Sequence, residues 1–149
     1  MRKKRAGKSP FLNLEHVGVI VRDMGKAVQY LSCLGIGPFE PLADPALADK
    51  LFRGKPSDWK VKISLAKIGP VTLELIQPVE GKSASKEFLE KKGEGIQHIA
   101  FAVDDLDREV AKLTKQGIEV MMSGKIPGGK FAYLETDVIG GMIIELIQR

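Results

Sequence analysis

The chain of 149 residues has few of the residue types that mark specialised protein classes. A single cysteine, Cys33, excludes an internal disulfide framework. No stretch approaches the roughly 20 apolar residues of a membrane-spanning helix, and no apolar segment of the secretory type follows the N-terminal charges. With 44% hydrophobic and 28% charged residues, the composition is that of an ordinary globular protein. We therefore expect a cytoplasmic protein without a membrane partner.

The body of the chain also lacks an excess of charge of one sign. The net charge of +4 comes from five basic residues that precede position 9. Without them, 18 Lys and Arg remain against 19 Asp and Glu, so no basic face is expected and nucleic acid is not a predicted partner. We predict that residues 1–11 form a disordered basic tail and that residues 12–149 form a single domain.

The most informative feature that is present is an internal repeat. A series of positions matches without a gap when the chain is aligned with itself at an offset of 82 residues. The matching pairs are His16 and His98, Val21 and Val103, Asp23 and Asp105, Val28 and Val110, Leu31 and Leu113, Gly35 and Gly117, and Ile36 and Ile118. The motif Glu-Leu-Ile-Gln also recurs, at residues 74–77 and 145–148. The chain is therefore predicted to contain two similar modules, at about 12–79 and 95–149.

Each module is predicted to have the order βαβββ. A β-rich run opens each module, and Asp23 or Asp105 follows it as the N-cap of a helix. Apolar residues at i, i+4 and i+7 then give each helix one apolar stripe. The stripes are Met24, Val28 and Leu31 in the first helix, and Leu106, Val110 and Leu113 in the second. Gly35 and Gly117 stand where a left-handed C-terminal cap ends each helix.

Three strands are expected after each helix, and glycine-containing turns separate the last two. The expected strands are 36–41, 60–68 and 71–77 in the first module, and 118–122, 131–135 and 142–148 in the second. A linker helix over 83–92 joins the modules. Residues 41–57 are expected to form a loop with one helical turn around 46–51. Two such modules side by side predict an α+β fold in which a curved mixed sheet encloses a trough.

The chain has only two histidines, and they occupy the same position in the two modules. A single histidine in a strand is usually a core residue, but pseudo-twofold symmetry would bring His16 and His98 to one shared point. Glu74 and Glu145 interrupt apolar strands, where a buried carboxylate is costly without a cation. The alternative is that each glutamate faces solvent. Two imidazoles and two carboxylates suit one divalent ion of Co, Ni, Zn, Mn or Fe.

Such a centre is suited to Lewis-acid chemistry, in which the metal polarises a carbonyl while a carboxylate removes the adjacent proton. Glu145 and Glu74 are the candidate catalytic carboxylates. Lys130 would meet a substrate phosphate or carboxylate if the glycine-rich segment 127–130 is a mobile lid, whereas a plain turn is the alternative. Gln97 is the second candidate for substrate binding.

At these residues the sequence resembles the vicinal oxygen chelate superfamily, which has the glyoxalase-like fold. The superfamily includes glyoxalase I, methylmalonyl-CoA epimerase, extradiol dioxygenases and metal-free antibiotic-binding proteins. The resemblance spans about residues 12–149, and within it residues 61–65 and 87–105 look most like methylmalonyl-CoA epimerase. It implies a homodimeric, metal-dependent epimerase. The two oxygens of a methylmalonyl thioester would chelate the metal, and Glu145 would serve as both ligand and base.

Two positions depart from the epimerase pattern. Gln97 replaces the first of two paired histidines, and no Glu lies between Glu40 and Glu74 to act on the opposite face of the substrate. Asp49 or Asp58 would have to replace it, or Glu74 would shuttle the proton. The alternatives are a glyoxalase I (lactoylglutathione lyase)-type isomerase of a glutathione hemithioacetal and a metal-free small-molecule-binding protein of the same fold. An extradiol dioxygenase is less consistent with four ligands, because its iron centre leaves the fourth position open.

Overall fold

The computed structural model describes residues 9–42 and 46–149. In this part of the chain, ten strands form one sheet in the order β2-β5-β6-β1-β7-β10-β9-β8-β3-β4. The strands are β1 (Leu14–Ile20), β2 (Glu40–Leu42), β3 (Ala48–Phe52), β4 (Lys55–Pro56), β5 (Lys60–Ile68), β6 (Val71–Glu80), β7 (Gly95–Ala102), β8 (Val120–Ile126), β9 (Gly129–Leu134) and β10 (Ile143–Gln148). The helices are α1 (Met24–Cys33), α2 (Ala84–Lys92) and α3 (Leu106–Thr114).

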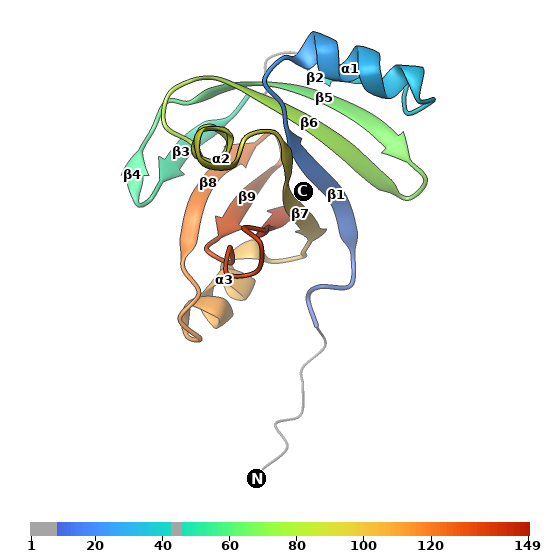
Figure 1. Cartoon of the computed structure of the whole chain (residues 1–149). Helices are drawn as coiled ribbons and strands as arrows, with labels where there is room; N and C mark the ends of the chain where they lie inside the picture. Colours follow the sequence, from blue (N-terminus) through green and yellow to red (C-terminus); the bar gives the residue numbers. More distant parts are fainter. Residues whose placement is uncertain (1–8, 43–45) are drawn as a thin grey trace.

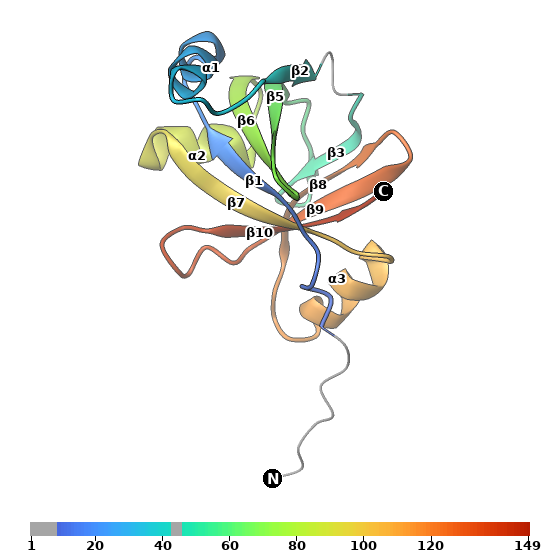
Figure 2. The same ribbon diagram turned by 90° about the vertical axis from the view of Figure 1, so that its right-hand side faces the viewer.

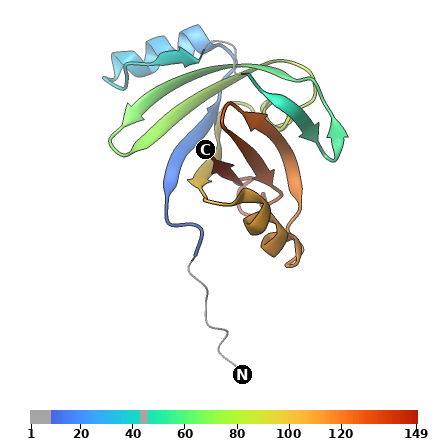
Figure 3. The same ribbon diagram turned by 180° about the vertical axis from the view of Figure 1, so that it is seen from behind.

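The sheet is mixed and curls into a half-barrel (Figures 1 and 2). At its centre, β1 is parallel to β6 and antiparallel to β7, and β7 is parallel to β10. The two outer parts, drawn in green and in orange to red in Figure 1, bend toward the same side. Helix α1 lies beside β6, and α3 lies beside β9 and β10, on the outer side of the curl (Figure 3). The predicted α+β fold with a curved mixed sheet is confirmed.

The helix boundaries also agree with the prediction. Asp23 and Asp105 each accept a hydrogen bond of 3.0 Å from the backbone N–H three residues further on. Gly35 and Gly117 have φ of +86° and +87°, a conformation that favours glycine after a helix. The linker helix is α2, and Ser83 is its N-cap. None of the helices in the described residues is long and apolar enough to span a bilayer.

The repeated Glu-Leu-Ile-Gln motif connects each final strand to the helix of its own module. Because side chains alternate across a strand, the Glu and Ile face the inner side of the curl while the Leu and Gln face outward. The Oε1 atom of Gln77 accepts a hydrogen bond of 2.8 Å from the backbone N–H of Met24. Gln148 Oε1 accepts the equivalent bond, also of 2.8 Å, from Leu106. Each Gln therefore satisfies the first N–H of a helix, where no intrahelical partner exists.

The segment between β2 and β5 differs from the prediction. The expected loop over 41–57, with a helical turn around 46–51, is wrong because this segment contains β3 and β4. Strand β3 pairs with β8 of the other module, with Phe52 opposite Met122. The local sequence does not encode this pairing, because what makes the segment a strand is contact with a partner edge far along the chain.

Two smaller boundaries also change. The strand expected over 36–41 is the shorter β2, and residues 43–45 of the predicted loop lie outside the described residues. Residues 1–8 of the predicted basic tail lie outside them as well. Further along, Phe11 packs edge-on against Phe101, with ring centroids 5.2 Å apart. Phe11, at the end of the tail predicted over residues 1–11, therefore contacts a residue of β7.

Two apolar clusters lie on the two faces of the sheet. The inner cluster consists of Trp59, Ala84, Met121, Met122, Phe131, Tyr133, Ile143 and Ile147. The outer cluster consists of Leu106, Ala132, Leu134 and Leu146, and it lies between α3 and the sheet. The inner cluster joins side chains from both modules, so it holds the sheet in its curved form.

Candidate metal centre

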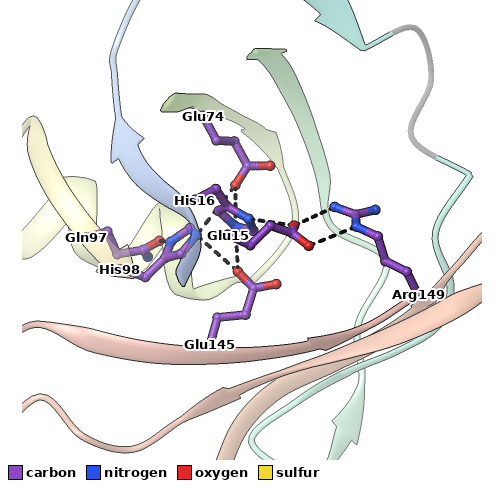
Figure 4. Close-up of polar contacts among 7 residues, drawn as sticks. All are labelled: Glu15, His16, Glu74, Gln97, His98, Glu145 and Arg149. Carbon is purple, nitrogen blue, oxygen red and sulfur yellow. Dashed lines mark hydrogen bonds and ion pairs between the residues drawn. The ribbon is translucent and has the colours of Figure 1, made fainter. Parts of the chain in front are cut away.

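The four residues predicted as ligands come from four adjacent strands. His16 lies on β1, Glu74 on β6, His98 on β7 and Glu145 on β10. Their side chains point toward one another on the inner side of the curl (Figure 4). The ligand atoms all lie within 4.8 Å of one another. The alternative that the two glutamates face solvent is therefore wrong.

The separations between these atoms agree with a shared ion. Nε2 of His16 lies 3.0 Å from Glu145 Oε2 and 3.2 Å from Glu74 Oε2. Nε2 of His98 lies 3.1 Å and 3.5 Å from the same two oxygens. Two atoms that are each ~2.1 Å from one metal ion are separated by about 3.0 Å at a right angle and about 3.4 Å at a tetrahedral angle. The arrangement can therefore accept an ion with little movement.

The cluster is also buried, so a polar atom in it that lacks a hydrogen bond lowers the stability of the fold. His98 is fully buried, and His16 and Glu145 are each 5% exposed. Within the described residues, Nε2 of His98 lies close to both carboxylates but makes no hydrogen bond of suitable geometry. A buried polar atom without a partner costs about 1–3 kcal/mol. A cation at the shared point would meet this nitrogen, and the donor set fits Zn, Co, Ni, Mn or Fe.

The carboxylates dominate the electrostatics of the cluster when no metal is bound. Burial would lower the pKa of His16, but hydrogen bonds with three glutamates raise it to about 12; they are Glu145, Glu15 and Glu74. Burial also lowers the pKa of His98, and the same two cluster carboxylates raise it overall. Burial raises the pKa of Glu74 and Glu145, yet their contacts with the imidazoles lower it overall. The carboxylates thus favour the protonated form of both imidazoles, and a divalent ion can take over this neutralisation of charge.

Two β-bulges place a hydrogen-bond acceptor beside each ligand imidazole. The pairing of β1 with β7 contains two register shifts, with one extra residue on each strand. The extra residues are Glu15 and Gln97, which are equivalent in the repeat. Oε1 of Glu15 accepts a hydrogen bond of 3.0 Å from Nδ1 of His16, and Oε1 of Gln97 accepts one of 3.0 Å from His98. With Nδ1 as donor, each Nε2 can present its lone pair to a metal.

A cavity of about 820 Å³ opens onto the cluster. Most of its walls are apolar, with side chains such as Trp59, Val61, Ile63, Leu65, Met122 and Phe131. Charged side chains other than the four ligands also line it, and these are Glu15, Glu40, Lys67 and Arg149. The cavity can therefore hold an apolar group near the metal position while charged groups contact polar parts of the same ligand.

The two candidate substrate contacts do not line this cavity. Gln97 is fully buried and contacts His98, so its contact is with a ligand rather than with the cavity. Lys130 forms an ion pair with Asp107 beside a shallower depression between β8 and α3. Pro127 and Gly128 form the turn of the β8–β9 hairpin, and Gly129 and Lys130 are the first residues of β9, which agrees with the plain turn that was the alternative to a lid. Lys130 faces outward because it is paired with Gln148 on the adjacent strand β10, and the Gln148 side chain lies on the outer face.

The candidates for the opposite acid lie elsewhere too. Asp49 pairs with Lys125, and Asp58 pairs with Lys50; neither aspartate lines the cavity. Glu40 does line the cavity. The sequence had indicated it only as the residue that precedes a stretch without glutamate.

Glu40 lies in the same cross-strand row as Glu74. Glu40 on β2 pairs with Leu65 on β5, and Leu65 pairs with Glu74 on β6. Directly paired residues point to the same face of a sheet, and adjacent strands lie ~4.8 Å apart. The Cα atoms of the two glutamates are therefore roughly 10 Å apart across the inner face.

The sequence analysis missed three further charged residues of the cavity. Lys67 could have been found from the β5–β6 hairpin register, which places it opposite Thr72 on the inner face. Neither Glu15 nor Arg149 could have been found from the strand pattern. A bulge redirects the Glu15 side chain, and Arg149 acts through its contact with Glu15. Arg149 donates to both Glu15 oxygens, at 3.0 Å and 2.6 Å (Figure 4).

Known proteins resemble this chain along most of its length. It is 28% identical over 141 residues to the uncharacterized protein YqjC of Bacillus subtilis, covering 91% of each chain. It is also 28% identical over 141 residues to the ethylmalonyl-CoA/methylmalonyl-CoA epimerase of Cereibacter sphaeroides, covering 91% of this chain and 96% of the epimerase. Among solved structures, the methylmalonyl-CoA epimerase of Mycobacterium tuberculosis superposes with a TM-score of 0.68 and 25% identity, covering 95% and 91% of the two chains.

The family assignment comes from a match that covers most of both modules. The model of the Glyoxalase/Bleomycin resistance protein/Dioxygenase superfamily matches residues 15–133. This match agrees with the curled mixed sheet and with the repeated βαβββ order. The chain therefore belongs to the glyoxalase/bleomycin resistance protein/dioxygenase superfamily.

Proposed function

We propose that this protein is a metal-dependent isomerase that removes the proton next to a thioester carbonyl, as methylmalonyl-CoA epimerase does. The observation that carries the proposal is the convergence of two imidazoles and two carboxylates at one buried point beside a cavity. The names of two relatives, both epimerases of acyl-CoA thioesters, support the substrate class.

His16, Glu74, His98 and Glu145 would hold one divalent ion, and the ion would supply polarisation of the carbonyl and stabilisation of the enolate. Glu145 directs Oε2 toward the ligand nitrogens. Its other oxygen then remains to accept the proton from the carbon next to the carbonyl. A positioned general base of this kind contributes roughly 10²–10⁴-fold to the rate.

The cavity matches the reacting end of such a substrate. Its volume of about 820 Å³ lies within the roughly 300–1,000 Å³ of small-molecule sites. The apolar walls suit an acyl chain. Lys67 is a cation on the wall without an ion pair among the described residues, and it would favour an acyl group that carries a carboxylate. The bulky nucleotide part of an acyl-CoA would extend out of the cavity.

Epimerisation also needs an acid on the face of the carbon opposite the base. Asp49 and Asp58 lie outside the cavity, so we assign this role to Glu40. Glu40 lies on the inner face in the same cross-strand row as Glu74, whereas Glu145 lies three strands beyond Glu74 in the sheet, so Glu40 and Glu145 lie on different sides of the cluster.

The test is proton exchange in deuterated water. Metal-loaded protein is incubated with one epimer of methylmalonyl-CoA, and mass spectrometry follows deuterium at C2 while chiral analysis follows the second epimer. We expect both signals. No deuterium at C2 would reject the epimerase proposal.

A glyoxalase I-type isomerase is the second candidate. Glu74 and Glu145 occupy equivalent positions and both contact the two imidazoles. Such a pair could move a proton along one face of a substrate without a third acid. Turnover of the hemithioacetal of methylglyoxal and glutathione, without exchange at methylmalonyl-CoA, would favour this reaction. Elemental analysis of protein purified without chelator distinguishes both enzymes from a metal-free binding protein.

A further inference from the structure

The two ligand imidazoles have different acceptors, although the repeat makes their positions equivalent. The acceptor for His16 is the carboxylate of Glu15, and the acceptor for His98 is the amide of Gln97. Hydrogen bonds to a charged acceptor are roughly twice as strong as those between neutral groups. A carboxylate on Nδ1 also raises the basicity of an imidazole as a metal ligand. The two halves of the site are therefore chemically unequal.

The acceptors also differ in how firmly they are held. Both oxygens of Glu15 receive hydrogen bonds from Arg149, at 2.6 Å and 3.0 Å. By contrast, Nε2 of Gln97 is buried and has no hydrogen-bond partner among the described residues. A paired and charged fork fixes the orientation of the Glu15 carboxylate. Among the described residues, the Gln97 side chain is held only by its hydrogen bond with His98 and by packing.

We propose that Glu15, oriented by Arg149, is a positioning residue that makes His16 the stronger of the two imidazole ligands. Gln97 gives His98 an uncharged and weaker anchor. The inference rests on the metal-centre part of the proposed function and is independent of the substrate. It assigns a role in metal retention to Arg149, which contacts none of the four ligands in the interactions of Figure 4.

The test compares affinities for Zn²⁺, measured by competition with a chromophoric chelator. Glu15→Leu removes the hydrogen-bond acceptor of His16, and Glu15→Gln keeps an uncharged acceptor like that of Gln97. Arg149→Met removes only the hydrogen bonds that orient Glu15. Gln97→Leu is the equivalent change at the other imidazole. Glu40→Gln is the matched control, because it removes one negative charge from the same cavity without touching an imidazole.

We expect Glu15→Leu to weaken Zn²⁺ binding by about 10–100-fold, the range for loss of a partner of a ligating histidine. Glu15→Gln, Arg149→Met and Gln97→Leu should each lose less than Glu15→Leu but more than Glu40→Gln. In ¹H–¹⁵N spectra of the Zn²⁺-loaded protein, the Nδ1–H signal of His16 should lose its protection from solvent exchange in Glu15→Leu, while that of His98 is unchanged.

Each outcome has a distinct meaning. If Glu15→Leu binds Zn²⁺ as well as Gln97→Leu or Glu40→Gln does, the positioning role is wrong while the metal centre stands. If the unaltered protein binds no divalent ion, both this inference and the proposed function are wrong. Should Glu15→Leu fail to fold, the comparison of Arg149→Met with Glu40→Gln decides, because equal affinities would overturn the inference.

Discussion

Nε2 of His16 lies 3.0 Å from Oε2 of Glu145, although 129 positions separate the two residues in the chain. The contact joins the first strand of one module to the last strand of the other across β7. Neither module contains it alone. The site is therefore a product of the fused pair, and its properties can be tested by changes on either side.

The first prediction concerns pH and metal. Because the pKa of His16 is raised to about 12, this imidazole holds its proton at neutral pH in the metal-free protein, and the raised pKa of His98 favours the protonated form of the second imidazole. A metal must displace those protons, so binding releases them and the affinity should rise with pH, by about tenfold per pH unit for each proton released. Isothermal titration calorimetry in buffers of different ionisation enthalpy counts the protons. Binding without proton release would contradict this account.

Glu145→Gln should abolish deuterium exchange at C2. The substituted amide keeps the shape of the side chain but cannot accept the proton, so a loss of roughly 10²–10⁴-fold or more is expected. Circular dichroism should show an intact fold, since glutamine has nearly the same size and shape as glutamate. Glu90→Gln is the control, because its side chain on α2 is 65% exposed and lies outside the cavity. Exchange at the rate of the unaltered protein would place the base elsewhere.

Glu40→Gln should slow the conversion of one epimer to the other more than it slows proton exchange at C2. If Glu40 acts on the face opposite Glu145, deuterium still enters at C2 with retention of configuration, while conversion to the other epimer slows by about 10²-fold or more. Zn²⁺ affinity should stay close to that of the unaltered protein. An equal slowing of exchange and epimerisation would show that Glu40 does not act on one face only.

Gly18→Ala should damage the metal centre by steric means. A Cβ atom at Gly18 would lie 1.9 Å from Cε1 of His98, so the imidazole would have to move. Overpacking of this kind costs about 1–3 kcal/mol, and the displaced ligand should weaken Zn²⁺ binding. Gly25→Ala is the matched control, since the nearest atom to its Cβ is 3.5 Å away. Unchanged Zn²⁺ affinity in Gly18→Ala would mean that His98 is not held against β1.

Gln148→Leu should lower stability and spare the metal centre. The side-chain oxygen of Gln148 satisfies the first N–H of α3, and loss of such a cap costs about 1 kcal/mol. For a chain of this size, that corresponds to roughly 2–4 °C in Tm. Thermal unfolding of the metal-free protein measures the change, and Gln77→Leu should act in the same way through α1. A fall in Zn²⁺ affinity would show that the two roles of the repeated motif are coupled.

Much of the fold could be predicted because the duplication is visible in the sequence. Asp23 and Asp105 cap their helices, and Gly35 and Gly117 end them, through interactions within a few residues. The repeat also predicted that His16, Glu74, His98 and Glu145 come together, because equivalent positions in fused modules meet at the pseudo-twofold axis. Strand β3 could not be predicted in the same way, since its partner β8 lies about 70 residues away along the chain.

Apart from β3 and β4, the sequence by itself determined the βαβββ order and which two histidines and two glutamates form the cluster, because these depend on local pattern and on duplication. Only the tertiary structure decided which other residues belong to the site. Bulges redirect Glu15 and Gln97 to the ligand imidazoles, and the β2–β5–β6 register brings Glu40 to the inner face. The physical reason is that pairing register sets which face a side chain occupies, and register is fixed by strands that are distant in sequence.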